Sequence, residues 1–150
     1  MHHLETTLAR LARPIFGRSW LRMVAYLGIC SAYLQGGLNK LVDFPSAIGE
    51  MDHFGLSPAP LFAVVVIGLE LTASAMILTG LLRWLGSLAL AAFTLLATLL
   101  ALRFWEMPVG MDRFMAANSF FEHLGLVGAF LLVAWLDLTA PAAGSSDQSR

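Results

Sequence analysis

The hydrophobic positions of this chain lie in long runs that charged residues rarely interrupt. Arg22 and Lys40 enclose 17 uncharged residues, and Arg83 and Arg103 enclose 19. The interval from Asp52 to Arg83 contains 30 residues and a single acidic side chain. Because about 20 mainly apolar residues cross the roughly 30 Å hydrocarbon core of a bilayer as a helix, these runs predict three transmembrane helices.

A fourth apolar run near the C-terminal end is shorter. His123 and Asp137 enclose only 13 uncharged residues, about 20 Å of helix, which cannot cross the core unaided. A span that begins at Asn118 is long enough, and it places Glu122 and His123 below the membrane surface.

The segments between the spans carry turn-forming residues. We expect outer loops over 41–60 and 106–117, which hold most of the remaining charge. Residues 80–84, the short link between the second and third spans, predict a tight helical hairpin on the inner side.

Composition agrees with a membrane protein. Of the 150 residues, 58% are hydrophobic and 13% are charged, against about 25% charged in an average soluble domain. The length suits one domain. We therefore predict an all-α integral membrane four-helix bundle, with a transmembrane domain over residues 20–138.

The positive side chains predict the orientation of this bundle. Short cytoplasmic flanks of membrane proteins are enriched in Lys and Arg. A cytoplasmic N-terminus leaves three positive residues outside, Lys40, Arg103 and Arg113, and places six inside: Arg10, Arg13, Arg18, Arg22, Arg83 and Arg150. Both termini are therefore predicted to be cytoplasmic.

The two ends of the chain differ from the spans. In residues 1–19, aliphatic side chains recur at helical spacing beside arginines, which favours a short interfacial helix, although a frayed terminus fits equally well. The aliphatic residues are Leu4, Leu8, Leu11 and Ile15. Residues 139–150 have nothing to bury, so we expect a disordered cytoplasmic tail.

Ionisable residues within the spans are the candidates for catalysis. Glu70 lies near the middle of the second run, and an ionisable group at that depth marks a functional site by default. Glu122 and His123 combine a carboxylate with the side chain that titrates near neutral pH unaided, which suits proton transfer. The structural alternative is that Glu70, protonated or paired with Lys40 or Arg103, only holds the helices together.

Five further polar or aromatic residues are candidates for ligand binding: Gln35, Asn39, Lys40, Arg103 and Trp105. Arg103 and the rings beside it suit an anionic or quinonoid head group, although arginines and aromatic belts are also common at any membrane surface. We predict that these residues, with Glu70, Glu122 and His123, enclose a cavity in the outer half of the membrane.

Helical spacing also predicts which faces point inward. The expected stripe of the third span is Ser87, Ala91, Thr94 and Thr98. Those of the first and fourth are Gly28, Ala32, Gln35 and Asn39, and Asn118, Glu122, Gly125 and Ala129. Small residues at such positions let membrane helices approach closely.

Several classes of chemistry find no support. The lone Cys30 excludes a dithiol within one chain. A single histidine with carboxylates is not a diagnostic metal set, so we predict no metal. The sequence shows no glycine loop for phosphate and no basic patch for nucleic acid.

Ordered motifs resemble those of the DoxX family. They are Gly37-Leu-Asn-Lys-Leu-Val-Asp-Phe44, Gly68-Leu-Glu-Leu71, Ala97-Thr-Leu-Leu100 with Phe104-Trp105, and Phe120-Phe-Glu-His-Leu-Gly-Leu-Val-Gly128. The resemblance implies a four-helix protein of the bacterial inner membrane, and places Lys40 and Glu70 at polar positions typical of the family. Some members are associated with quinone-linked sulfur oxidation or with oxidant-detoxifying oxidoreductase complexes.

Two functions remain open at this point. The first is a membrane redox component that binds a quinone-like lipophilic molecule and relays protons through Glu70, Glu122 or His123, as a subunit of a membrane oxidoreductase. Its electrons come from a redox partner protein or from the bound molecule. The second is a non-enzymatic module, either a small-solute carrier or an assembly subunit. The sequence leaves open whether the chain is catalytic and whether it forms a homo-oligomer.

Overall fold

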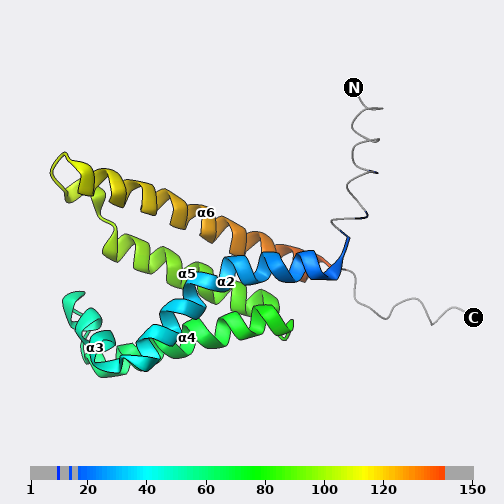
Figure 1. Ribbon diagram of the computed structural model, residues 1–150, viewed down its shortest axis with the longest axis horizontal. Helices are drawn as coiled ribbons and strands as arrows, with labels where there is room; N and C mark the ends of the chain where they lie inside the picture. Colours follow the sequence, from blue (N-terminus) through cyan, green and yellow to red (C-terminus); the bar gives the residue numbers. More distant parts are fainter. Residues whose placement is uncertain (1–9, 11–13, 15–16, 141–150) are drawn as a thin grey trace, which may run out of the picture.

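The computed structural model describes residues 10, 14 and 17–140. The expectations for the interfacial segment and for the tail therefore fall almost entirely outside the described residues. Within them the chain is helical (Figure 1). The elements are α2 (Ser19–Val42), α3 (Phe44–His53), α4 (Ala59–Thr79), α5 (Arg83–Ala101), the 3-10 helix η1 (Phe104–Glu106) and α6 (Met111–Thr139).

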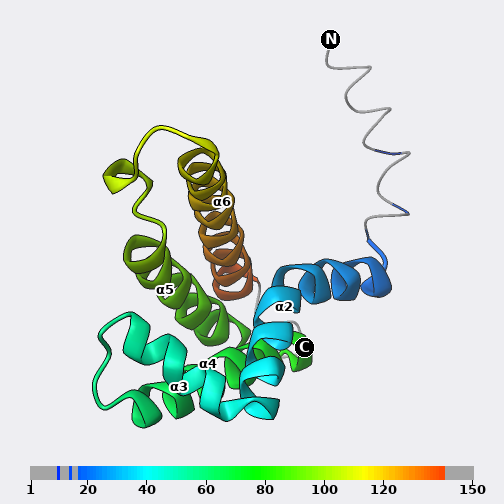
Figure 2. The ribbon, with the colours of Figure 1, turned by 60° about the vertical axis from the view of Figure 1, so that its left-hand side comes forward.

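Four long helices form the bundle that the sequence predicts. Helix α4 packs beside both α2 and α5, and α5 packs beside α6, whereas α2 and α6 touch only sparsely (Figures 1 and 2). The start of α2, the α4–α5 turn and the end of α6 lie at one end of the bundle, and α3 and η1 lie at the other. The bundle is therefore closed along three of its helix pairs and open along the fourth.

The lengths of the helices suit a bilayer. The segments Ala59–Thr79, Arg83–Glu106 and Met111–Thr139 are long and apolar enough to cross a membrane. Helix α2 is more polar, yet its 24 residues extend about 36 Å, which also exceeds the hydrocarbon core. The all-α membrane bundle is thus confirmed.

The expected outer loops are wrong in two places. Residues 44–53 form α3, because Asp43 accepts a hydrogen bond from the Ser46 backbone N–H and Pro45 occupies the first turn, both of which favour a helix start. Helix α6 begins at Met111, seven residues before the expected span. The predicted tight hairpin at residues 80–84 is confirmed, with Gly80 in the left-handed conformation at φ 83°.

Two glycines set how closely the helices pack. A Cβ at Gly37 of α2 would lie 2.8 Å from Leu71 of α4, and one at Gly86 of α5 would lie 2.7 Å from the Ala73 carbonyl oxygen of α4. Without hydrophobic attraction between helices in lipid, such close packing is what holds membrane bundles together. Gly37 thereby fixes α2 against the turn of α4 that carries Glu70.

A polar cluster joins the helices at the end that holds the α4–α5 turn. Arg83 donates from Nη1 to Asp137 Oδ1 at 3.0 Å and from Nε to the Ile77 carbonyl at 3.1 Å. Asp137 also accepts from the Trp84 backbone N–H at 3.2 Å. The Arg83 guanidinium lies 4.8 Å from the centre of the Tyr26 ring of α2. All four long helices are therefore tied together at this end.

Candidate functional site

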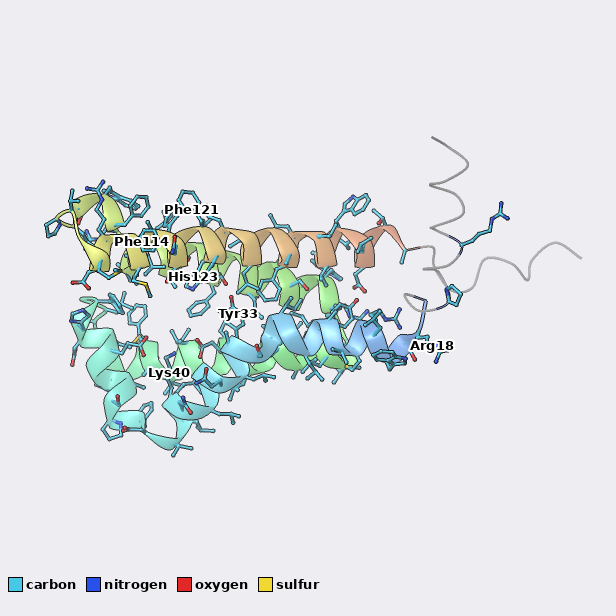
Figure 3. The ribbon with its side chains drawn as sticks, turned by 45° about the horizontal axis from the view of Figure 1, so that its top comes forward. Arg18, Tyr33, Lys40, Phe114, Phe121 and His123 are labelled. Carbon is cyan, nitrogen blue, oxygen red and sulfur yellow. The ribbon has the colours of Figure 1, made fainter. Side chains whose placement is uncertain are left out.

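A cavity lies where α2 and α6 separate, and we call it the inner cavity. Its volume is about 230 Å³. Every helix from α2 to α6 contributes to its wall, whose residues are Ala32, Tyr33, Gly36, Lys40, Glu50, Glu70, Phe93, Thr94, Ala97, His123 and Leu126. Figure 3 shows Tyr33 and His123 in the space between α2 and α6. Rings, aliphatic groups and ionisable groups therefore share one cavity.

Glu70 and Lys40 form an ion pair within this wall. Lys40 Nζ lies 3.4 Å from Glu70 Oε1, and the two side chains are 16% and 6% exposed. Glu70 Oε2 is buried and has no hydrogen-bond partner among the described residues. The carboxyl group is thus half satisfied, and its second oxygen is available to a donor in the cavity or to a proton.

A third charged side chain completes this group. Glu50 Oε2, on α3, lies 3.8 Å from the same Lys40 ammonium, and its side chain is 44% exposed. One positive charge therefore lies between two carboxylates. Packing of Ala47 and Met51 against Ala59 and Ala63 of α4 holds α3, and with it Glu50, in this position.

Two threonines of α5 orient the opposite wall. Thr98 donates its hydroxyl hydrogen to the Thr94 carbonyl at 2.6 Å, so its oxygen accepts at 2.9 Å from His123 Nδ1. If the imidazole is neutral, this geometry assigns its proton to Nδ1 and makes Nε2 the acceptor atom of the ring. Thr94 donates to the Leu90 carbonyl in the same way, so Tyr33 donates its hydroxyl hydrogen to Thr94.

The structure brings together some of the predicted site residues and separates others. Lys40, Glu70 and His123 line the inner cavity, and Asn39 lines a polar cavity next to it. Gln35 is exposed on α2 and lines neither cavity. Glu122 is exposed on α6 beside His123, as expected for adjacent helical positions, which diverge by about 100°.

Arg103 and Trp105 lie elsewhere on the molecule. Arg103 is exposed, pairs with Glu106 at 3.3 Å and lines a separate surface cavity with His53 of α3. Trp105 is exposed and packs edge-on against Phe120. The predicted head-group clamp is therefore at a different place from the Glu70 cavity.

The predicted inward stripe is correct for α5 and wrong for α2. Its α5 members, Ser87, Ala91, Thr94 and Thr98, are all buried. In α2 the buried residues are Cys30, Tyr33 and Gly37, each one or two positions after a member of the expected stripe. In a bilayer, small and polar residues do not by themselves identify the inner face, because apolar side chains are equally at home in lipid and core.

The stripe of α6 is wrong for the same reason. Its buried residues are Phe130 and Ala134, whereas Asn118, Glu122 and Gly125 are exposed. The lining of the inner cavity also contains Tyr33, Glu50, Phe93 and Thr94, which were not predicted as site residues. The spacing of Tyr33 could have identified it, because it lies one helical turn before Gly37 and two turns before Lys40, on the same face of α2.

The chemistry available in the inner cavity is hydrogen bonding and proton exchange. Lys40 supplies donors, Glu70 Oε2 and His123 Nε2 supply acceptors, and Tyr33 and Phe93 supply ring faces. Among the described residues, no group of three His, Cys, Asp or Glu side chains lies together as metal ligands do. The cavity is thus suited to an organic ring that carries polar substituents.

Fold and cavity together define a multi-pass helical membrane protein with a polar internal site. The DoxX family model matches residues 21–103, more than half of the chain, and the chain belongs to the DoxX family. It is similar to the Inner membrane protein YphA of Escherichia coli (strain K12), with 24% identity over 140 residues that cover 91% of each protein. No solved structure matches. The chain is accordingly a multi-pass protein of the inner membrane, in contact with lipid.

Proposed function

We propose that this protein is a membrane redox component that binds a quinone-like lipophilic molecule in the inner cavity. The observation that carries the proposal is the half-satisfied carboxyl group of Glu70 in a cavity that also contains His123 and two aromatic rings. An ionisable group at membrane depth is costly to keep and usually serves a function. Membership of the DoxX family is compatible with a redox-associated role.

The size of the cavity supports a single-ring head group. A volume of about 230 Å³ exceeds the roughly 150 Å³ that accommodates benzene in an apolar protein cavity. Tyr33 and Phe93 can pack against the faces or edges of such a ring. Because α2 and α6 separate beside the cavity, an isoprenoid tail can extend from there into the bilayer.

The polar groups support proton exchange at the two ends of the ring. A bound quinone takes up two electrons and two protons when it is reduced. Lys40 can donate a hydrogen bond to a carbonyl oxygen, while Glu70 and His123 can each hold or release a proton. Glu122 lies outside the cavity, so we assign the relay to Glu70 and His123. The electrons come from a redox partner protein or from the bound molecule itself.

Mass spectrometry of lipids that co-purify with the detergent-extracted protein tests the proposal. We expect a quinone-like compound with the wild-type chain and at least about a tenfold loss with Gly36→Leu, a change of roughly 1.4 kcal/mol in binding. A Cβ at Gly36 already lies 3.6 Å from Glu70 and Lys40, so a leucine there fills the cavity.

Gly28→Leu is the matched control. It adds the same side chain to the same helix, where no described atom lies within 4 Å of an added Cβ. Equal recovery of the compound from both variants would contradict binding in the inner cavity. If no such compound is recovered from the wild-type chain, the Lys40–Glu70 ion pair is better explained as a structural contact that holds the helices of a carrier or an assembly subunit together.

A further inference from the structure

A second cavity adjoins the inner one, and we call it the outer cavity. Its volume is about 310 Å³, and its lining is Gly36, Asn39, Lys40, Asp43, Ser46, Ala47 and Glu50. Gly36, Lys40 and Glu50 belong to both cavities. The inner cavity has aromatic and aliphatic walls, whereas almost all side chains around the outer one are polar or charged. The two cavities therefore meet at the Lys40 ammonium.

The exposed fraction of the ionisable side chains decreases from the outer cavity to the inner cavity. The side chains of Glu50, Lys40 and Glu70 are 44%, 16% and 6% exposed. The Lys40 ammonium contacts both carboxylates, because it is 3.8 Å from Glu50 Oε2 and 3.4 Å from Glu70 Oε1. Contacting ionisable groups thus lead from the exposed side chain of Glu50, on α3, to the buried carboxyl group of Glu70.

Glycine at position 36 keeps this junction open. An added Cβ would lie 3.6 Å from both Glu70 carboxyl oxygens and from Lys40 Nζ. A side chain as large as leucine would therefore cover the ion pair on the side where the two cavities meet. The packing of α3 against α4 gives the outer cavity a fixed wall.

We propose that the outer cavity is the aqueous entry through which protons reach Glu70, with Glu50 and Lys40 lining the passage. The step is a proton transfer from solvent to the Glu70 carboxylate. The other titratable groups around Glu70 are Tyr33 of α2 and His123 of α6, and both face the inner cavity. The purpose of the passage rests on the proposed function, but its existence rests on the two cavities alone.

Charge gives the passage a measurable signature. The outer cavity is lined by one positive and two negative side chains, Lys40, Asp43 and Glu50, so its net charge is −1 when all three ionise. A cationic thiol reagent should therefore reach the cavity faster than an anionic one. The expected ratio is about fivefold, the order expected for one net charge within a Debye length of the thiol.

Thiol labelling of the protein in lipid nanodiscs tests this proposal. In a Cys30→Ala background, Gly36→Cys is treated with membrane-impermeant methanethiosulfonates that carry a trimethylammonium or a sulfonate group. We expect labelling of Gly36→Cys, with the cation faster, and loss of that preference when Glu50→Gln is added. Gly28→Cys is the control, because it is exposed on the same helix but lines neither cavity.

Two results would overturn the proposal. Labelling of Gly36→Cys as slow as that of Gly28→Cys means that water does not reach the junction. Equal rates for both reagents, unchanged by Glu50→Gln, mean that access does not pass the acidic lining. If Gly36→Cys does not fold, Asn39→Cys in the same lining replaces it. None of these measurements needs a bound quinone, so their failure is separate from failure of the proposed function.

Discussion

At the scale of single residues, the inner cavity depends on groups that are oriented by their neighbours. Thr98 leaves the Nε2 atom of His123 as an acceptor, and Lys40 satisfies one of the two oxygens of Glu70. These partners are short or closely held side chains, so little conformational entropy remains to be lost on binding. The acceptor atoms of His123 and Glu70 are therefore preorganised for a ligand.

Glu70→Gln should impair ligand binding or activity more than stability. The amide keeps the shape of the side chain and can still accept from Lys40, but it cannot carry a proton. We expect affinity for a quinone-like ligand to fall about tenfold or more, the effect of losing one charged hydrogen bond. The unfolding free energy should change by less than the binding free energy, because Glu50 still lies beside the Lys40 ammonium.

Thermal melting in detergent and ligand binding should be measured on the same preparations of Glu70→Gln. Glu106→Gln is the control, since Glu106 also pairs with a positive side chain, Arg103, but is exposed and does not line the inner cavity. Losses of equal size in melting and binding would identify Glu70 as a structural lock.

At the scale of helices, the sequence predicted the long elements better than their faces or their ends. Four charge-poor runs were enough to predict four helices, because membrane spans need a fixed length of apolar chain. The α5 stripe was predicted because Ser87, Thr94 and Thr98 are small polar residues at helical spacing, and membrane helices place such residues at their contacts. Tyr33 and Phe130 were missed, because lipid and the bundle interior are equally apolar and hydropathy does not separate them.

Helix α3 shows why an outer loop was expected where a helix lies. Residues 41–60 contain several prolines and glycines, which usually indicate turns. Asp43 and Pro45 instead start the helix, and Ala47 and Met51 bury its apolar face against α4. This tertiary contact decides the structure, and with it the position of Glu50, so the outer cavity could not be predicted from the spans alone.

Gly86→Ala should destabilise the contact between α4 and α5. The added methyl group would lie 2.7 Å from the Ala73 carbonyl oxygen, which belongs to the helix backbone and cannot move aside. We expect a loss of about 1–3 kcal/mol in the free energy of unfolding, as is typical of overpacking.

Gly125→Ala is the control for Gly86→Ala, with no described atom of a neighbouring side chain or helix within 4 Å of the new methyl group. It should be neutral or slightly stabilising, by up to about 1 kcal/mol. Equal melting temperatures in detergent would mean that α4 and α5 are less closely packed than the structure indicates.

At the scale of the whole molecule, the bundle has two unlike ends. Arg83, Asp137, Trp84 and the Tyr26 ring tie the helices together at the end of the α4–α5 turn. Toward the other end, α2 and α6 separate around the inner cavity, and α3 supplies the wall of the outer cavity. The orientation of the bundle decides which compartment supplies the protons.

The positive side chains predict that the α3 end faces outward. Arg18, Arg22 and Arg83 belong to the opposite end of the bundle, where α2 begins and the α4–α5 turn lies. Because positive residues in short flanks favour the cytoplasm, both termini should be inside and the outer cavity should open to the periplasm. We expect an impermeant thiol reagent to label Ser46→Cys in intact cells, and Ser145→Cys only after permeabilisation, both in a Cys30→Ala background. Ser46 is exposed at the outer cavity, so a thiol there faces solvent on the side of the membrane where the α3 end lies. The opposite labelling pattern would reverse the topology and would make the cytoplasm the source of protons for Glu70, while leaving both cavities and the proposed ligand unchanged.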